Sequence, residues 1–224
     1  MSVATTATAA LPSLSEQVER LISAGAQDVV RIGADELRAA VPDHSAPGSL
    51  LVVDPARLPA SALAPLLSRD GHACFVVSDM QDVDAFAAID QSTPPAGPVY
   101  LVQGLDRGDA MRDWSPNEAL PALASAGRSP LTLVEGLHWL LQRPDLLERN
   151  RCFMTIGSRL RKPDGSLDAR TPAIWISNGT GRDGPGRRNA PKVGWCWAGN
   201  RHTWLGFASA RRRVPVAAPL TSRS

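Results

Sequence analysis

The chain has 224 residues, which is long enough for one sizeable domain but short for two independent cores. Hydrophobic residues make up 43% and charged residues 21%, an ordinary globular composition. No apolar run approaches the roughly 18 residues that a membrane span needs. Three cysteines, an odd number, argue against a secreted scaffold held together by disulfides.

The net charge of +2 hides two halves of opposite sign. Residues 1–120 contain 7 arginines and 16 acidic residues, a net of −9. Residues 121–224 contain 17 basic and 6 acidic residues, a net of +11. We interpret this split as charge complementarity between the halves or as attraction for an anionic ligand, and the charge alone does not indicate nucleic acid.

The ends of the chain are expected to be flexible around one compact domain. Residues 1–12 lack the basic start of a secretory signal, so we expect a cytoplasmic protein with a flexible N-terminal arm. A basic tail is expected at 211–224. The domain between them spans 13–210, with an acidic half at 13–120 and a basic half at 121–210.

The acidic half predicts helices alternating with short strands. Ser13 and Glu16 form the pattern of a capping box, which predicts a helix over 14–24. Strands about 25 residues apart with helices between them favour βαβ crossovers and a small, at least partly parallel sheet. We expect further helices at 34–41, 58–68 and 82–89, and strands at 50–54, 73–77 and 99–102.

Two stronger helix signals lie in the middle of the chain. Ser115-Pro116-Asn117-Glu118 predicts a helix that ends near residue 127. Thr132 and Glu135 predict another helix, which Pro144 breaks. The connection between these helices is too long for a helix-turn-helix motif, which argues against DNA binding through this unit.

The last third reads as an antiparallel sheet, so the predicted fold class is α+β. Aromatic and β-branched residues predict strands at 152–156, 173–177, 193–198 and 203–208. A polar, glycine-rich loop at 178–191 separates the second from the third. Residues 193–206, VGWCWAGNRHTWLG, contain three of the six tryptophans, and Gly199-Asn200 is typical of a two-residue hairpin turn.

That hairpin would gather aromatic side chains on one face. With Gly199-Asn200 as the turn, Trp197 would face His202 and Trp195 would face Trp204 across the ladder. Cys196 would point to the other face, which excludes a nucleophile–base pair with His202 and makes it a small buried hydrophobic residue. The tryptophans are either core residues or a flat platform for a planar or cationic ligand.

These residues form the candidate site. His202 is the candidate catalytic residue, because its ordinary pKa suits proton transfer near neutral pH, although a structural role is an alternative. Beside the three tryptophans, Asn200 at the turn and the cations Arg159 and Arg201 are candidate ligand-binding residues, the arginines for an anionic group. Scattered cysteines and histidines predict no metal site, and no cofactor motif is present.

Two other groups of residues have functional alternatives. Asp54 and Asp79 each follow a predicted strand, where ligands gather in parallel sheets, but capping of the next helix is the simpler role. Six cations in the predicted loops of the basic half form either a solvated face or an oxyanion site: Arg159, Arg161, Lys162, Arg182, Arg187 and Arg188.

The chain resembles an actinobacterial family of uncharacterised proteins classed as a domain of unknown function. The strings that carry the resemblance are GWCWAGNRHTWLG, PAIWIS (172–177), CFMTIGSR (152–159), GRSPLTLVEGL (127–137) and FVVSDMQDVDAF (75–86). It covers about residues 48–210, and it implies a bacterial protein but no activity or cofactor. The connection at 178–191 is longer than the family usually has, and Arg201 stands where proline is usual.

The sequence leaves three alternative functions for the protein. The first is a small-molecule-binding protein or enzyme that uses the aromatic pocket for a planar or anionic ligand. The second is a protein-interaction module, in which the same tryptophans bind a protein partner or a second copy. The third is nucleic-acid binding through the basic half, which would weaken steeply with salt.

Overall fold

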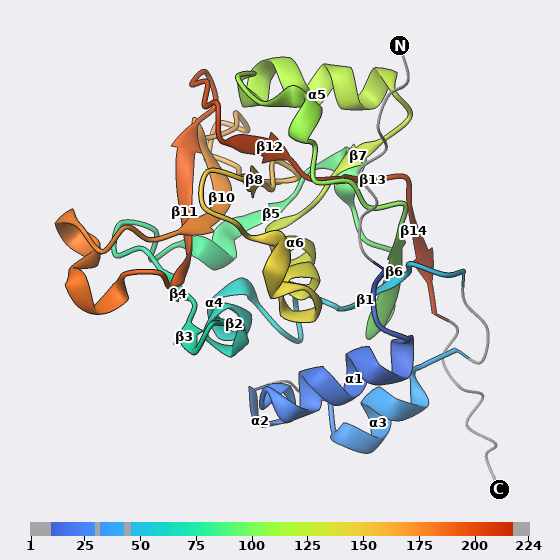
Figure 1. Cartoon of the computed structure of the whole chain (residues 1–224). Helices are drawn as coiled ribbons and strands as arrows, with labels where there is room; N and C mark the ends of the chain where they lie inside the picture. The colour runs from blue at the N-terminus through green and yellow to red at the C-terminus, as the bar shows by residue number, and fades with distance from the viewer. Residues whose placement is uncertain (1–9, 30–31, 43–45, 217–224) are drawn as a thin grey trace, which may run out of the picture.

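The computed structural model describes residues 10–29, 32–42 and 46–216, and in this part of the chain it is an α+β protein, as predicted (Figure 1). Residues 1–9 of the expected arm and 217–224 of the expected tail lie outside the described residues. No helix within the described ranges is long and apolar enough to cross a membrane. The helices are α1 Leu14–Ser23, α2 Ala26–Val29, α3 Ala34–Ala39, α4 Ala60–Leu63, α5 Pro116–Ser125 and α6 Leu133–Gln142.

All three predicted capping boxes form, and each begins a ten-residue helix. In each box the Ser or Thr hydroxyl accepts a hydrogen bond from the glutamate N–H, and the glutamate carboxylate accepts one from the cap residue N–H. These bonds satisfy N–H groups that a helix start leaves unpaired. The pairs are Ser13–Glu16, Ser115–Glu118 and Thr132–Glu135.

A three-stranded antiparallel sheet has the order β1-β6-β14. Its strands are β1 Leu50–Val53, β6 Val99–Gln103 and β14 Arg212–Pro215. The expected parallel βαβ arrangement is therefore wrong for β1 and β6, which run antiparallel. A parallel pair needs a long crossover connection, usually a helix; in residues 54–98 the only helices are the four-residue α4 and single helical turns, beside four short strands. β14 also shows that ordered structure extends beyond residue 210, into the expected tail.

A five-stranded mixed sheet has the order β12-β8-β10-β11-β4. Its central pairs, β8–β10 and β10–β11, are antiparallel as expected, whereas both edge pairs are parallel. The strands are β4 Phe75–Val76, β8 Cys152–Met154, β10 Arg170–Ile176, β11 Pro191–Trp197 and β12 Leu205–Phe207.

The predicted tryptophan hairpin does not form, because β11 and β12 lie on opposite sides of β8 and β10 (Figure 1). A turn does form, but at Ala198-Gly199, one residue before the expected position, and in it the Asn200 N–H donates to the Trp197 carbonyl over 3.0 Å. The chain then runs against the segment before α5 and the first turn of α5: Asp113 N–H donates to the His202 carbonyl, and Asn117 N–H to the Ala198 carbonyl. These bonds replace the ladder that a hairpin would have supplied.

Three two-stranded sheets complete the fold. β2 pairs with β3, β5 with β9 and β7 with β13, all antiparallel. The strands are β2 Ser68–Arg69, β3 His72–Ala73, β5 Phe86–Ala88, β7 Ser129–Pro130, β9 Ser158–Leu160 and β13 Ser209–Ala210.

Helix α6 lies in the centre of the molecule and contacts both main sheets (Figure 1). A Cβ on Gly136 would lie 2.6 Å from the Thr155 methyl beside β8, so glycine allows the helix to approach the large sheet. On the other side of the helix, Val53 N–H of β1 donates to His138 Nε2 over 3.2 Å.

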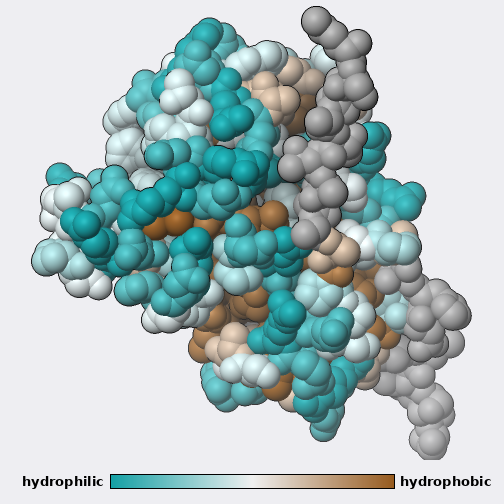
Figure 2. Space-filling model, viewed as in Figure 1, coloured by the Kyte–Doolittle hydropathy of each residue, from teal (hydrophilic) through white to brown (hydrophobic). Residues whose placement is uncertain are grey.

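Figure 2 shows hydrophilic residues over most of the visible surface, with hydrophobic residues between them near the middle.

His138 is expected to make the protein less stable as the pH falls below about 6.5. The ring is fully buried; Nδ1 donates to the Val134 carbonyl and Nε2 accepts from Val53 N–H, so the imidazole is neutral. Burial lowers its pKa from 6.5 to about 4. The unfolded state therefore takes up a proton first, and the free energy of unfolding should fall by on the order of 3 kcal/mol between pH 6.5 and pH 4.

Urea denaturation at stepped pH would measure this loss, and a nuclear magnetic resonance titration of the His138 ring would follow the proton. His138→Gln should flatten that part of the profile because glutamine does not titrate. A ring that titrates near pH 6.5 in the folded protein would contradict the assignment.

Ion pairs join the acidic and basic halves, as the charge split suggested. In four of them an arginine of the basic half binds a carboxylate of the acidic half. Most of the side chains in these four pairs are partly exposed to solvent. Such pairs contribute little each to stability, but they neutralise cations locally. They are Arg151–Asp109, Arg170–Asp82, Arg182–Asp79 and Arg201–Glu118.

Candidate functional site

The structure separates the three tryptophans that sequence analysis placed together. Trp195 lines one surface cavity and Trp204 lines another, while Trp197 is 48% exposed. The expected pairing of Trp195 with Trp204 is wrong, since Trp195 lies opposite Pro172 of β10. Trp195 and Trp197 still make an edge contact, with their ring centroids 4.5 Å apart.

His202 lies in the connection between β11 and β12, outside the linings of both cavities. Its ring centroid is 5.3 Å from that of Trp204, and its Nε2 is enclosed without a hydrogen-bond partner among the described residues. Burial lowers its pKa. The expected pairing with Trp197 is wrong, because Trp197 lies opposite Arg170.

The other three candidates make structural contacts. Arg201 forms an ion pair with Glu118 at the start of α5, and Asn200 is exposed at the turn. Arg159, on β9, is only 8% exposed, and its guanidinium donates to the Asp168 carbonyl over 2.6 Å. The predicted residues therefore do not converge on one site.

A polar cavity of about 360 Å³ opens where β10, β11 and the end of β4 meet the loop 178–190, and we call it the Trp175 cavity. Trp175 of β10 and Trp195 of β11 form its aromatic part. Gly194 makes room for the Trp175 ring, which a Cβ there would meet at 2.5 Å. Its charged lining residues are Asp79, Arg182, Asp183, Arg187 and Lys192.

Lys192 and Asp183 form the buried polar base of the Trp175 cavity. Their side chains are 14% and 11% exposed, with Nζ 2.6 Å from Oδ2, and the Ser177 hydroxyl donates to the same oxygen over 2.7 Å. Burial opposes ionisation of Asp183, but these two hydrogen bonds outweigh it and hold its pKa below the usual range. The Lys192 ammonium also lies 4.8 Å from the centre of the Trp175 ring.

The two arginines of the cavity have fewer contacts than the buried pair of Lys192 and Asp183. Arg182 is 78% exposed and contacts Asp79 over 3.1 Å. Arg187 stacks on Phe75, with its guanidinium carbon 4.3 Å from the ring centre. With Lys192 they place three cations against two carboxylates, so the cavity carries a net positive charge.

A second, smaller cavity of about 210 Å³ adjoins the Trp175 cavity, and Trp175 and Asn178 line both. Trp204 contributes its other aromatic wall, at a ring-centroid distance of 6.2 Å from Trp175. Arg149 also lines it, and its guanidinium donates to the side-chain oxygens of Asn178 and Asn189. Arg149 thus anchors both ends of the loop that carries Arg182 and Arg187.

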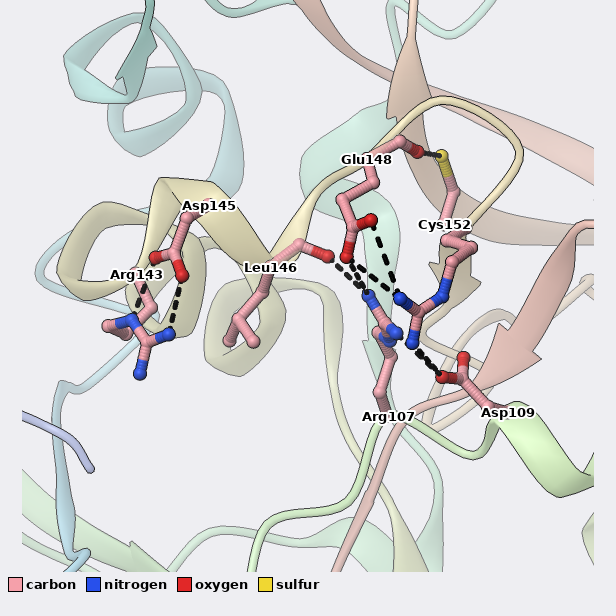
Figure 3. Close-up of polar contacts among 8 residues, drawn as sticks. Arg107, Asp109, Arg143, Asp145, Leu146, Glu148 and Cys152 are labelled. Carbon is pink, nitrogen blue, oxygen red and sulfur yellow. Dashed lines mark hydrogen bonds and ion pairs between the residues drawn. The ribbon is translucent and has the colours of Figure 1, made fainter. Parts of the chain in front are cut away.

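A network of ion pairs fixes the chain beside Arg149 (Figure 3). The Asp109 carboxylate accepts from Arg107 over 2.6 Å and from Arg151 over 3.1 Å, and Arg151 also contacts Glu148 over 3.2 Å. Because Glu148 and Arg151 flank Arg149, this network holds the turn whose side chain anchors the loop. The Cys152 thiol completes it by donating to the Glu148 carbonyl over 3.2 Å (Figure 3).

The three cysteines are expected to react slowly with iodoacetamide in the folded protein at pH 7.5. Burial raises the pKa of Cys74 to about 12 and of Cys152 and Cys196 to about 11, so the reactive thiolate is scarce. Mass spectrometry should find little alkylation before unfolding and three labels after it. Rapid native labelling of Cys152 would instead indicate a reactive thiol in the second cavity.

Sequence analysis identified Trp195 and the arginines of the Trp175 cavity but missed Trp175 and the buried pair of Lys192 and Asp183. Arg182 and Arg187 belong to the predicted oxyanion cluster, and Asp79 was noted after its strand. Trp175 and Lys192 were missed because their association depends on the β10–β11 register, in which they lie opposite each other. The local signal was limited to a single tryptophan in the β10 segment and a single lysine in the β11 segment.

Comparison with known proteins identifies a family, but the function of that family is unknown. The model of a family described as a family of unknown function (DUF5701) matches residues 20–216. No curated protein and no solved structure matches the chain. Within the described ranges, no three His, Cys, Asp or Glu side chains gather as ligands for a metal ion.

Proposed function

Since the chain belongs to this family of unknown function, we propose a function from the site itself: the protein binds a small anionic ligand with a planar group in the Trp175 cavity. The observation that carries the proposal is the meeting of two tryptophans and three cations at one cavity of about 360 Å³. This volume lies at the lower end of the range of small-molecule sites.

The aromatic and charged parts suit different ends of such a ligand. A planar group would pack against Trp175 or Trp195, because indole rings offer large apolar faces. A carboxylate or phosphate would bind Arg182 and Arg187, whose guanidinium groups donate two parallel hydrogen bonds to such anions. Lys192 and Asp183 already satisfy each other, so we assign them to shaping the base of the cavity.

Binding is expected to weaken about 10- to 100-fold in Arg187→Ala, since a hydrogen bond to a charged group contributes about 1.5–3 kcal/mol. The probes are nucleoside monophosphates and aromatic carboxylates, screened by thermal shift and titrated by tryptophan fluorescence. Arg188→Ala is the matched control: it removes the same charge from the same loop, but Arg188 does not line the cavity.

A ligand whose affinity is equally unchanged in both variants binds elsewhere and contradicts the proposal, as does the absence of binding across the whole screen. Equal weakening in both would point to general electrostatic attraction rather than a defined site. Enzymatic use of the ligand, with His202 as the proton-transfer residue, stays a prediction, and His202→Ala would test it.

A second candidate function, binding of a protein partner, is favoured by two exposed tryptophans. Trp114 is 40% exposed and Trp197 48%, and the segments that carry them are joined by the hydrogen bond from Asn117 N–H to the Ala198 carbonyl. Exposed aromatic residues are enriched in interfaces. Light scattering of the wild type and of Trp197→Ser would detect a second copy. Nucleic-acid binding stays a prediction that no structural observation favours.

A further inference from the structure

An apolar cavity of about 270 Å³ lies apart from the Trp175 cavity, between α4, β5 and the start of α6. No lining residue is shared with either cavity described above. Its walls are almost wholly aliphatic, aromatic and proline side chains. They include Pro59 and Ala60 at the start of α4, Phe86 and Ala87 of β5, and Val134 of α6.

One end of the apolar cavity carries two hydroxyl groups. Ser158 Oγ accepts a hydrogen bond from Leu133 N–H over 2.9 Å, and Thr132 Oγ1 accepts one from Glu135 N–H over 3.2 Å. Both oxygens act as acceptors there, so each hydroxyl keeps its own O–H to donate. A ligand that offers an acceptor oxygen to this end would match those donors.

The charges around the apolar cavity oppose an anion. Asp84 is the one lining residue that carries a charge at neutral pH, and its carboxylate already accepts from Ser61 N–H over 2.8 Å and from the Ser61 hydroxyl. No described lysine, arginine or histidine lines the cavity. An anionic ligand would lose hydration without gaining a counter-charge.

We propose that this cavity is a second binding site, for an uncharged apolar group that carries one carbonyl-type acceptor. An apolar cavity of about 150 Å³ accommodates benzene, so about 270 Å³ accommodates a ring with a short substituent or a short acyl chain. Its ligand differs in charge from that of the Trp175 cavity, and the two sites can be tested separately.

Three probes of nearly equal shape test the proposal on the full chain by two-dimensional nuclear magnetic resonance titration. Acetophenone has the carbonyl, α-methylstyrene replaces it with an apolar group, and benzoate replaces it with an anion. Acetophenone is expected to bind saturably, with shifts at the amides of Ala60, Ala87 and Leu133. α-Methylstyrene should bind several-fold more weakly, and benzoate at least tenfold more weakly at this site.

Variants that fill the mouth of the apolar cavity provide the second part of the test. Ala87 and Ala56 are exposed lining residues, so Ala87→Leu, or Ala56→Leu if the first does not fold, should weaken acetophenone at least tenfold. Ala85→Leu is the matched control, since Ala85 is exposed on the same segment and does not line the cavity.

Ser158→Ala should reduce the preference for acetophenone over α-methylstyrene, because it removes one donor. The proposal is overturned if acetophenone gives no saturable shifts, if benzoate binds as well as acetophenone at these amides, or if the mouth variants bind like Ala85→Leu.

Discussion

Replacement of Arg213 by methionine is expected to lower the free energy of unfolding by about 3–5 kcal/mol, because it leaves a buried carboxylate without its counter-charge. Arg213 of β14 is 6% exposed at its side chain and Glu135 of α6 is fully buried. Two hydrogen bonds join them, Nε to Oε1 over 2.6 Å and Nη2 to Oε2 over 2.7 Å. Methionine preserves much of the apolar stem but removes both bonds.

The surroundings show why this pair should matter more than the surface pairs. Arg213 also donates to the Ser129 hydroxyl over 2.6 Å and to the Pro130 carbonyl over 2.9 Å, and the Tyr100 hydroxyl donates to Glu135 over 3.2 Å. The pair thus joins β14, β7, β6 and α6 in one largely buried network.

Denaturant unfolding at neutral pH would measure the loss. Arg212→Met is the matched control, because Arg212 is exposed and donates to the Gln103 side chain, and its replacement should cost less than about 1 kcal/mol. Adding Glu135→Gln to Arg213→Met should recover part of the loss by removing the unpaired charge. Equal losses in the two single variants would show that the buried pair is not important.

Replacement of Gly108 by alanine is expected to destabilise the protein by about 4 kcal/mol, since backbone strain and overlap add together. Gly108 has φ +75°, a conformation that side chains rarely adopt. An added Cβ would also lie 2.1 Å from the Phe207 carbonyl oxygen of β12. The neighbouring Gly206 has the overlap but not the positive φ, because its Cβ would meet the Arg107 carbonyl oxygen at 2.6 Å.

Gly165→Ala separates the two causes. Gly165 has φ +84°, but nothing lies within 4 Å of an added Cβ, so its replacement should cost about 1–2 kcal/mol from backbone strain alone. Thermal and denaturant unfolding of both variants would give the difference. A Gly108→Ala variant no less stable than Gly165→Ala would show that the β12 backbone moves aside easily.

Sequence analysis predicted the features that depend on neighbouring residues. Each capping box needs side chains only three residues apart, and all three begin helices as expected. The β1 strand was identifiable from its apolar run, which is buried at all four positions. The polar loop after β10 was also expected, and its arginines line the candidate site.

The features that sequence analysis missed depend on pairings between distant segments. A turn does form, but at Ala198-Gly199 rather than at the expected Gly199-Asn200, and the groups that would extend it into a hairpin bond residues just before and at the start of α5. Arg213 resembles a solvated tail residue until Glu135, 78 residues earlier in the chain, is placed beside it. Neither partner is identifiable from local patterns, so the tryptophan hairpin and residues 212–215 of the expected tail were assigned wrongly.

The three-stranded sheet β1-β6-β14 has a consequence for the order in which the chain can fold. Its middle strand β6 ends at residue 103, but its second neighbour β14 is synthesised more than a hundred residues later. Until then β6 presents an unpaired edge, which can associate with other chains. A fragment of residues 1–120 should therefore aggregate rather than fold. The halves that charge distinguishes are not separate folding units, and folding should be slow because of this distant pairing.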